Sequence, residues 1–210
     1  VWVDYVKPGA ELASAVHERL KQHKGAAPDV IVLGNHGLVI AAADVSSVDA
    51  LLQGVLRRTA MPFPNVAAAP VDPQVAALWK KVGYVPSGIP VVQQLAVRDD
   101  LLTFAKEKWV LYPDHAVFLG EAAAVFDETR SPQGFLADYD KPPVCVFVPG
   151  VDVMVSESAN TGQRAMIQCY ADVVHRLPNK KDVVSLSHEQ IAELLNWDAE
   201  KYRQQLNAKK

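Results

Sequence analysis

One histidine in the sequence stands where it could bind a metal ion. His36 lies in the segment 33–38, Leu-Gly-Asn-His-Gly-Leu, between two runs of aliphatic residues at 30–33 and 38–40. A turn at a strand end holds a side chain rigidly and leaves it exposed, and neutral imidazole is the commonest ligand for Zn²⁺ and related ions. The alternative is a histidine that only hydrogen-bonds within its own turn. The residue type by itself leaves both interpretations open.

The other ligands of such a site are not visible in the sequence. A catalytic zinc takes three protein ligands, and the patterns HxH, HxxxH and HExxH do not occur in the chain. Asp114 and His115 are adjacent polar residues that could reach a cleft, and a structural role in a turn is the alternative. Lys7 and Arg164 are candidate phosphate contacts that nothing distinguishes from solvated charges. The remaining histidines are predicted to be solvated: His17, His23, His175 and His188.

The elements around His36 follow from the spacing of apolar residues. Residues 1–6 alternate as a strand does and stop at a Pro-Gly turn, and residues 11–22 carry an apolar residue every four positions, which predicts a helix. Residues 30–33 predict a buried strand, and the Gly-Asn-His-Gly that follows predicts a hairpin-like turn into a second strand. A capping pattern at 46–49 then predicts a helix.

The same order of elements recurs later in the chain. An apolar run at 144–148 breaks at Pro-Gly, resumes at 151–155, and is followed by a helix predicted at 159–177. This order of buried strand, turn, strand and helix predicts a degenerate internal repeat, and chance recurrence of a common α/β arrangement is the alternative. Between the two copies the pattern predicts helices at 75–82 and 99–108, a turn at 112–115, a strand at 116–119 and an exposed loop at 127–142.

Composition sets the broad class of the protein. Basic residues number 21 and acidic residues 24, so the balance gives no electrostatic footprint for nucleic acid. No apolar run approaches the ~20 residues that cross a bilayer. Two cysteines outside any CxxC pair are predicted to be reduced and buried, which suits a cytoplasmic protein. The chain opens on a strand-like segment with no Met, which predicts that the natural chain continues upstream of Val1.

Proline content suggests where the chain divides. Residues 61–75 contain four prolines and no charge pattern, which is typical of a linker. We therefore predict four parts: 1–60, the linker 61–75, a second α/β region at 76–180, and a helical tail at 181–210 that packs on the body or on a neighbouring subunit.

Four motifs in order carry a resemblance to a known family. They are Pro8-Gly9, Asn35-His36-Gly37, Pro113-Asp114-His115 and Val148-Pro149-Gly150-Val151. In this order they resemble the class II aldolase/adducin family, and in particular its longer, rhamnulose-1-phosphate aldolase-type members. The resemblance implies an α/β fold with layered α-β-α architecture and a central, mainly antiparallel sheet, followed by a smaller α/β region. Residues 1–60 would be the C-terminal part of the first domain.

The resemblance also implies a function. It implies a metal-dependent lyase that cleaves or forms a C–C bond in a sugar phosphate or related hydroxy-ketone through an enediolate, with Zn²⁺ or another divalent ion. His36 would be the third metal ligand, and the other ligands, the catalytic acid and a phosphate-binding stretch would lie upstream of Val1. A homo-oligomer is implied. The alternatives are a decarboxylase, dehydratase or epimerase on the same fold, or a non-catalytic adducin-like interaction module.

Overall fold

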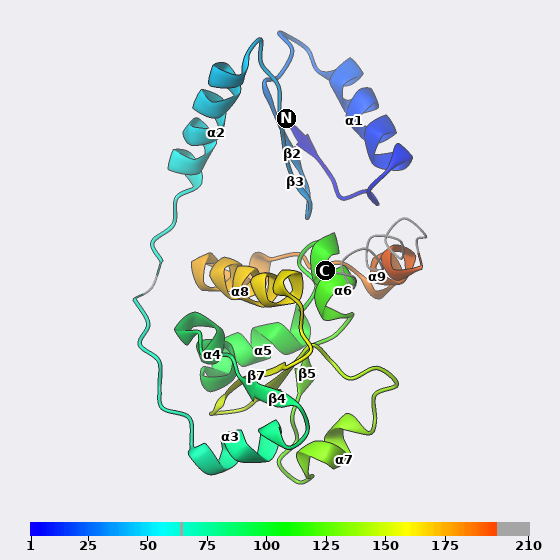
Figure 1. Ribbon diagram of the computed structural model, residues 1–210. Helices are drawn as coiled ribbons and strands as arrows, with labels where there is room; N and C mark the ends of the chain where they lie inside the picture. Colours follow the sequence, from blue (N-terminus) through cyan, green and yellow to red (C-terminus); the bar gives the residue numbers. More distant parts are fainter. Residues whose placement is uncertain (64, 197–210) are drawn as a thin grey trace. The chain divides into compact units, whose positions relative to one another are not determined.

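The computed structural model of the chain describes residues 1–63 and 65–196. The chain forms two compact units, Val1–Pro62 (unit 1) and Phe63–Lys210 (unit 2). Each unit combines helices with one small sheet that contains both parallel and antiparallel pairs (Figure 1). The predicted α/β class is therefore confirmed at this level, and the layered α-β-α arrangement stays a prediction.

Unit 1 is a three-stranded sheet with two helices. Its elements are β1 (Trp2–Val3), α1 (Ala10–Gln22), β2 (Val30–Leu33), β3 (Gly37–Ile40) and α2 (Val45–Thr59). β2 lies in the middle, parallel to β1 and antiparallel to β3. The core is small: Val3, Ile31 and Leu33 pack against the apolar stripe of α1, and neither helix contains a fully buried residue. The helix predicted from residue 46 begins at Val45, because the side chain of Asp44 caps it by accepting from the Ser47 N–H at 2.8 Å.

Unit 2 is larger and has a four-stranded sheet in the order β4-β7-β6-β5. Its strands are β4 (Tyr84–Pro86), β5 (Ala124–Val125), β6 (Cys145–Val148) and β7 (Asp152–Ser156). Its helices among the described residues are α3 (Pro73–Lys80), α4 (Pro90–Val97), α5 (Asp99–Glu107), α6 (Pro113–Leu119), α7 (Pro132–Leu136), α8 (Thr161–Arg176), the 3₁₀ turn η1 (Lys180–Asp182) and α9 (His188–Leu195).

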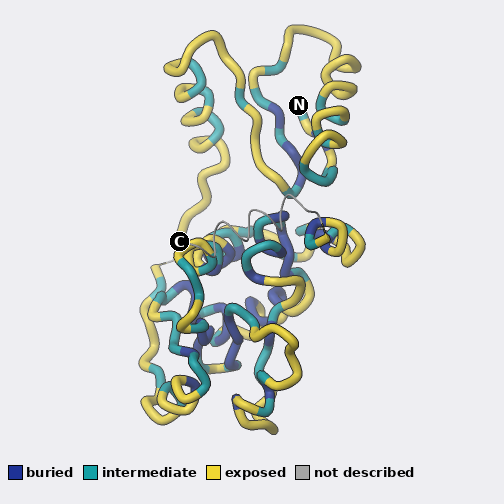
Figure 2. Tube along the Cα trace, turned by 45° about the vertical axis from the view of Figure 1, so that its right-hand side comes forward, coloured by how far each residue is buried: buried dark blue, intermediate teal, exposed yellow. Residues whose placement is uncertain are grey.

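The sheet of unit 2 is covered on both faces. One face packs Val146, Val148 and Met154 against Trp79 of α3 and Phe135 of α7. On the other side, α4 contacts β6 and β7 and packs against α8. Every residue of β6 is buried, and so are the first four residues of β7. Figure 2 shows this contrast, with a dark-blue interior in unit 2 and mostly exposed or half-buried helices in unit 1.

The predicted strand at 116–119 is wrong, because these residues belong to helix α6. Pro113 is the first residue of the helix, and Gly120 follows its last residue with a φ of 91°. The acidic Asp114 lies in the first turn, where the helix dipole favours a negative charge. The buried residues His115, Ala116 and Leu119 recur at helical spacing. The helices predicted at 99–108 and 159–177 are confirmed as α5 and α8 to within two residues.

The proline-rich segment is attached to unit 2 rather than free. The Arg176 guanidinium carbon lies 4.3 Å from the ring centroid of Phe63, and the buried side chain of Gln93 bonds both backbone groups of Ala69. Val71 packs against the core. The two units divide after Pro62, and α3 begins at Pro73, inside the predicted linker 61–75.

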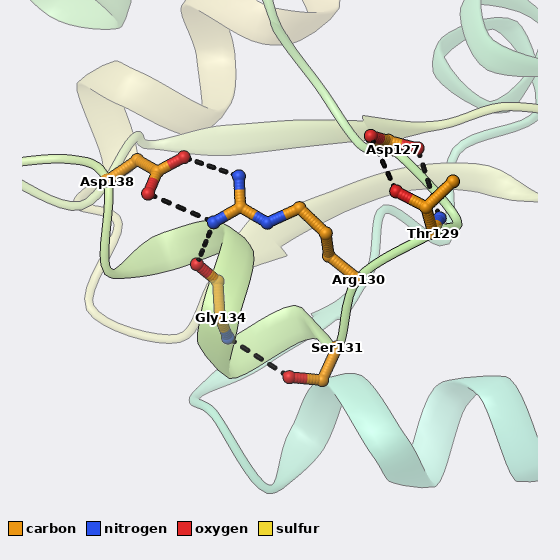
Figure 3. A network of polar contacts seen from close by, with 6 residues as sticks. All are labelled: Asp127, Thr129, Arg130, Ser131, Gly134 and Asp138. Carbon is orange, nitrogen blue, oxygen red and sulfur yellow. Dashed lines mark hydrogen bonds and ion pairs between the residues drawn. The ribbon is translucent and has the colours of Figure 1, made fainter.

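The loop at 127–142, predicted to be exposed, contains helix α7 and an arginine clasp (Figure 3). The Arg130 guanidinium donates to both carboxylate oxygens of Asp138, at 2.5 and 3.0 Å, and to the Gly134 carbonyl oxygen at 2.6 Å. The hydrogen bonds from Arg130 hold the pKa of Asp138 below its usual value. The clasp closes the short helix α7 onto the loop that follows it.

Two further findings concern the chain as a whole. Among the described residues, no helix combines the length and the apolar composition needed to span a bilayer. α9 opens with the predicted capping box, in which Ser187 and Gln190 exchange side chain-to-backbone hydrogen bonds. The remainder of the predicted tail, residues 197–210, lies outside the described residues.

Candidate functional site

The turn that carries His36 is a three-residue hairpin loop. Leu33 of β2 pairs with Gly37 of β3, so residues 34–36 form the loop. Asn35 adopts a left-handed conformation with φ of 51°, which asparagine tolerates better than most residues. The His36 N–H donates to the Leu33 carbonyl oxygen at 3.1 Å and closes the turn. The sequence prediction of a hairpin-like turn is confirmed.

Gly34 is required by a close approach of β1. Its N–H donates to the Val3 carbonyl oxygen at 2.8 Å, and a Cβ at this position would lie 3.0 Å from the Tyr5 backbone nitrogen and 3.1 Å from the Trp2 ring. The end of β1 therefore rests against the turn. Gly37 has a different reason, because its φ of 152° belongs to the region that favours glycine.

The side chain of His36 is exposed on this turn. An exposed imidazole on a rigid hairpin suits a single metal ligand, since a ring nitrogen is accessible while the backbone is fixed. Within residues 1–63 and 65–196, no three His, Cys, Asp or Glu side chains lie close enough to hold a metal ion together. The described residues therefore fit one ligand position of a metal site and do not fit a whole site.

His115 lies in the core of unit 2 and is fully buried. Its Nδ1 accepts from the Leu111 N–H at 3.2 Å, so the proton of the neutral ring is on Nε2, which has no partner among the described residues. The ring lies 3.7 Å from that of Tyr112 and 4.9 Å from that of Tyr170, centroid to centroid. Burial lowers the pKa of His115 to about 3. His115 is therefore a neutral residue packed among aromatic rings.

Asp114 is less buried than its neighbour His115. It lies in the first turn of α6 and is partly buried. Asp114 and His115 belong to unit 2, whereas His36 belongs to unit 1. Their catalytic role stays a prediction from the resemblance.

A thiol and a phenol meet beside α6, and sequence reasoning did not find this pair. The Tyr112 hydroxyl lies 2.9 Å from the Cys169 sulfur, and burial raises the pKa of that hydroxyl well above its usual value. Cys169 is exposed, in contrast to the prediction that both cysteines are buried, because it precedes the buried Tyr170 on the outer side of α8. Cys145 is buried in β6 as predicted, and burial raises the pKa of its thiol to about 12.

The β6–β7 turn carries a second buried polar group that sequence reasoning missed. Asp152 is 2 % exposed, and one of its carboxylate oxygens accepts from the Ser87 hydroxyl and the Val153 N–H, both at 2.7 Å. Burial raises the pKa of Asp152. The nearby Gln93 amide donates to the Val151 carbonyl oxygen at 3.2 Å. The partners are 58 and 65 positions apart in the chain, so no local pattern could have revealed them.

The two candidate phosphate contacts differ in their surroundings. Arg164 donates from Nε to the Ala159 carbonyl oxygen at 3.0 Å and from a terminal nitrogen to the Ser156 carbonyl oxygen at 2.9 Å. Its guanidinium thus fastens the loop between β7 and α8. Lys7 lies in the half-buried stretch after β1. No described contact joins Lys7 to His36 within unit 1.

Comparison with protein-family models, with curated proteins and with solved structures returns no match for this chain. The indications of function therefore come from the residues of the chain and from the order of its motifs.

Proposed function

We propose that the protein is a metal-dependent lyase of the class II aldolase type, in which His36 supplies one ligand of a divalent-metal site. The substrate class is a phosphorylated sugar or a related hydroxy-ketone, and the reaction cleaves or forms a C–C bond by way of an enediolate. The metal is Zn²⁺ or another divalent ion, and the protein acts as a homo-oligomer in the cytoplasm. The layered α-β-α arrangement of that family belongs to the same proposal.

One observation carries this proposal: among the described residues, the only histidine on a strand-to-strand turn is also the histidine of the Asn-His-Gly motif. The turn fixes its backbone through the Leu33 carbonyl oxygen, and the side chain is exposed. A histidine used only to satisfy its turn would accept or donate through its ring, whereas here the backbone N–H closes the turn. The ring is therefore not needed for the local structure.

The remaining ligands and the catalytic acid must come from outside the described residues, since one imidazole is fewer than the three ligands of a catalytic zinc site. Because the described residues supply only one such ligand, a non-catalytic, adducin-like interaction module is the second candidate function. Decarboxylase, dehydratase and epimerase chemistry on the same fold are further variants of the enzyme proposal, because an enediolate-type intermediate serves each of them.

Metal content tests the proposal most directly. The complete polypeptide encoded by the gene is purified without added chelator, and bound metal is measured by mass spectrometry for the wild type, His36→Ala and His17→Ala. His17 is an exposed histidine of α1 in the same unit and serves as the matched control. We expect about one divalent ion per chain in the wild type and in His17→Ala, with at least about a tenfold loss of affinity in His36→Ala.

Two results would contradict the proposal. A wild-type protein without stoichiometric metal would favour the interaction module, and a His36→Ala protein that keeps all its metal would remove His36 from the site. Cleavage of a panel of ketose phosphates by the metal-loaded wild type then separates a lyase from the other enediolate chemistries.

A further inference from the structure

Strand β3 is an open edge of the sheet in unit 1. Among the described strands its only neighbour is β2, so no described strand pairs with its other side. Leu38 is 41 % exposed and Val39 is 42 % exposed, and these two side chains point to opposite faces of the strand. An exposed, apolar edge strand is a template for another strand, and natural proteins protect such edges with charges, prolines or bulges.

Two other sheet edges carry such protection. At the opposite edge of unit 1, the Arg19 side chain donates from Nε to the Trp2 carbonyl oxygen at 3.2 Å, which occupies an outward group of β1. In unit 2 the edge strand β4 ends at Pro86, which has no N–H to donate. Residues 37–43, Gly-Leu-Val-Ile-Ala-Ala-Ala, contain neither a charge nor a proline. Of these three edges, β3 is the one without protection.

Unit 2 shows how an edge in this position is filled. Its β6–β7 hairpin and the β2–β3 hairpin both enclose three residues, so β7 corresponds to β3. β4 pairs antiparallel with the outer edge of β7, and the middle pair of that ladder is Val85↔Val155. Val155 lies three positions after the pair that closes its hairpin, and in β3 this position is Ile40. An antiparallel strand centred on Ile40 would therefore repeat the arrangement of unit 2.

The backbone groups of Ile40 point away from β2. The Ala41 N–H donates to the Asp29 carbonyl oxygen at 3.0 Å, so the odd-numbered residues of β3 direct their backbone groups to β2. The even-numbered residues Leu38 and Ile40 direct theirs to the open side. A strand that pairs antiparallel with β3 can therefore exchange two hydrogen bonds with Ile40.

The charge pattern of this edge is complementary to itself. The uncharged stretch 37–43 has Ile40 at its centre, with His36 before it and Asp44 after it, and both flanking side chains are exposed. When two copies pair antiparallel with Ile40 opposite Ile40, each position stands opposite the one equally far on the other side of Ile40. His36 of one copy then lies opposite Asp44 of the other, at both ends of the ladder. An imidazole N–H can donate to a carboxylate, so both ends are matched.

The sizes of the side chains fit the same register. Leu38 stands opposite Ala42 of the second copy, and Val39 stands opposite Ala41. Each large side chain therefore faces a small one across the ladder. A register centred on Val39 would instead shift the histidine and the carboxylate out of alignment. The charge pattern thus selects the register that is centred on Ile40.

We propose that β3 pairs with β3 of a second copy of the chain, antiparallel and with Ile40 opposite Ile40, so that two three-stranded sheets join into one continuous sheet. The two-fold axis makes the interface closed, as in most homodimers. The inference specifies the homo-oligomer of the proposed function and does not rest on its metal chemistry. The two are compatible, because a histidine that binds a metal commonly donates its other ring N–H to a carboxylate.

Disulfide cross-linking tests the register. In the complete polypeptide encoded by the gene, with Cys169→Ser as background, Val39→Cys and Ala41→Cys are co-expressed with different affinity tags. These two positions form a non-hydrogen-bonded pair across the proposed ladder, with Cα atoms about 4.5 Å apart, which suits a disulfide. After mild oxidation we expect a disulfide between residue 39 of one chain and residue 41 of the other, identified by mass spectrometry of the joined peptides.

Each cysteine variant alone is the matched control. Two copies of Val39→Cys place their thiols diagonally across the ladder, with Cα atoms about 7–8 Å apart, which is too far for an unstrained disulfide. We expect each variant alone to give a yield at least about tenfold lower than the co-expressed pair. An equal yield from Val39→Cys alone would indicate a register centred on Val39 and would overturn the proposed one.

The charged ends of the ladder give an independent measurement. Asp44→Asn removes the charge and keeps a residue that caps α2 equally well, so the fold of unit 1 is retained. The dissociation constant of the dimer, measured by analytical ultracentrifugation at low salt, should rise about two- to thirtyfold, because two equivalent contacts are weakened together. Asp49→Asn removes another exposed carboxylate from α2 and should leave the constant unchanged.

Three outcomes would overturn the proposal. A complete polypeptide that stays monomeric at every concentration would show that β3 does not pair with a second copy. An oligomer without the disulfide between residues 39 and 41 would place the interface elsewhere. A dissociation constant that responds equally to Asp44→Asn and Asp49→Asn would remove the histidine–carboxylate contact and with it the register. None of these readouts involves a metal, so they are separate from the metal content of His36→Ala, which tests the proposed function.

Discussion

The buried histidine of unit 2 should make its stability depend on pH. His115 is fully buried, and burial lowers its pKa from 6.5 to about 3. In the unfolded chain the ring takes up a proton as the pH falls through 6.5, whereas in the folded protein it stays neutral until about pH 3. Protonation therefore favours the unfolded state, so the stabilisation is complete above pH 6.5 and is lost progressively toward pH 3.

The size of the effect follows from the two pKa values. The free energy of unfolding of unit 2 should fall by about 2 kcal/mol between pH 7 and pH 5 through His115 alone. With a typical dependence on urea of about 2 kcal/mol per molar, this corresponds to a shift of the unfolding midpoint of about 1 M.

The assay needs a signal from unit 2 and a variant without the titrating ring. Trp2→Phe removes the only tryptophan of unit 1, so fluorescence then reports unit 2. In this background, urea unfolding is measured at pH 7 and pH 5 for the parent, for His115→Asn and for His188→Asn. The asparagine carbonyl can replace Nδ1 as the acceptor of the Leu111 N–H, and His188 is an exposed histidine that serves as the control.

The readout is the difference in stability between the two pH values, because His115→Asn will also lower stability at both by leaving space in the core. We expect that difference to shrink by about 2 kcal/mol in His115→Asn and to stay unchanged in His188→Asn. A parent protein and a His115→Asn variant with the same pH dependence would refute the assignment of a buried, neutral ring.

Four further predictions concern the proline-rich segment, the two hairpin turns and helix α2. Gln93→Leu leaves both backbone groups of the segment it binds unpaired, so unit 2 should lose about 2–4 kcal/mol in urea unfolding, whereas the neighbouring Gln94→Leu should change it little. Gly34→Ala forces a Cβ against the end of β1 and should destabilise unit 1 by about 1–3 kcal/mol, followed by Trp2 fluorescence. Gly54→Ala, in open space in the middle of α2, should instead stabilise it by about 0.5–1 kcal/mol, and a loss there would contradict the reasoning. Burial raises the pKa of Asp152, so the folded state disfavours its charged form. Compared with the wild type, Asp152→Asn should therefore raise the urea midpoint more at pH 7 than at pH 4. A variant midpoint below that of the wild type at pH 7 would show that the charge is needed.

Local patterns predicted the elements whose apolar periodicity or turn residues are complete. The β2–β3 hairpin, α5 and α8 belong to this group. Helix α6 was missed because its seven residues begin at a proline, which also starts turns, and because valine and phenylalanine at 117 and 118 favour strands. Helix α4 was missed because a short, fully apolar run has no readable period.

The hydrogen bonds of the buried polar residues Gln93 and Asp152 could not be predicted from the sequence, because they join residues that are distant in the chain. Gln93 bonds backbone groups 24 and 58 positions away, and Asp152 bonds Ser87 across 65 positions. His115 is a case in which a local pattern was misleading. Its position next to Asp114 suggested a catalytic pair. Consecutive residues of a helix point in different directions, however, and in the fold the imidazole packs among aromatic rings.

The repeated hairpin separates what the backbone of the turn requires from what chemistry requires. Leu33 pairs with Gly37 and Val148 with Asp152, so Asn35 and Gly150 are the middle residues of the two three-residue loops. Both have positive φ, at 51° and 72°. In unit 2 the turn is tied inward, because the Gly150 N–H donates to the Ala96 carbonyl oxygen at 2.9 Å. Both hairpins thus have a residue with positive φ in the middle of the loop, whichever residue follows it, so the conformation of Asn35 by itself carries no information about function. The residue after it is free to differ: it is Val151 in unit 2 and His36 in unit 1. Since the equivalent hairpin forms with valine there, the imidazole is not needed for folding, and its replacement by alanine should remove the proposed metal ligand without removing the turn.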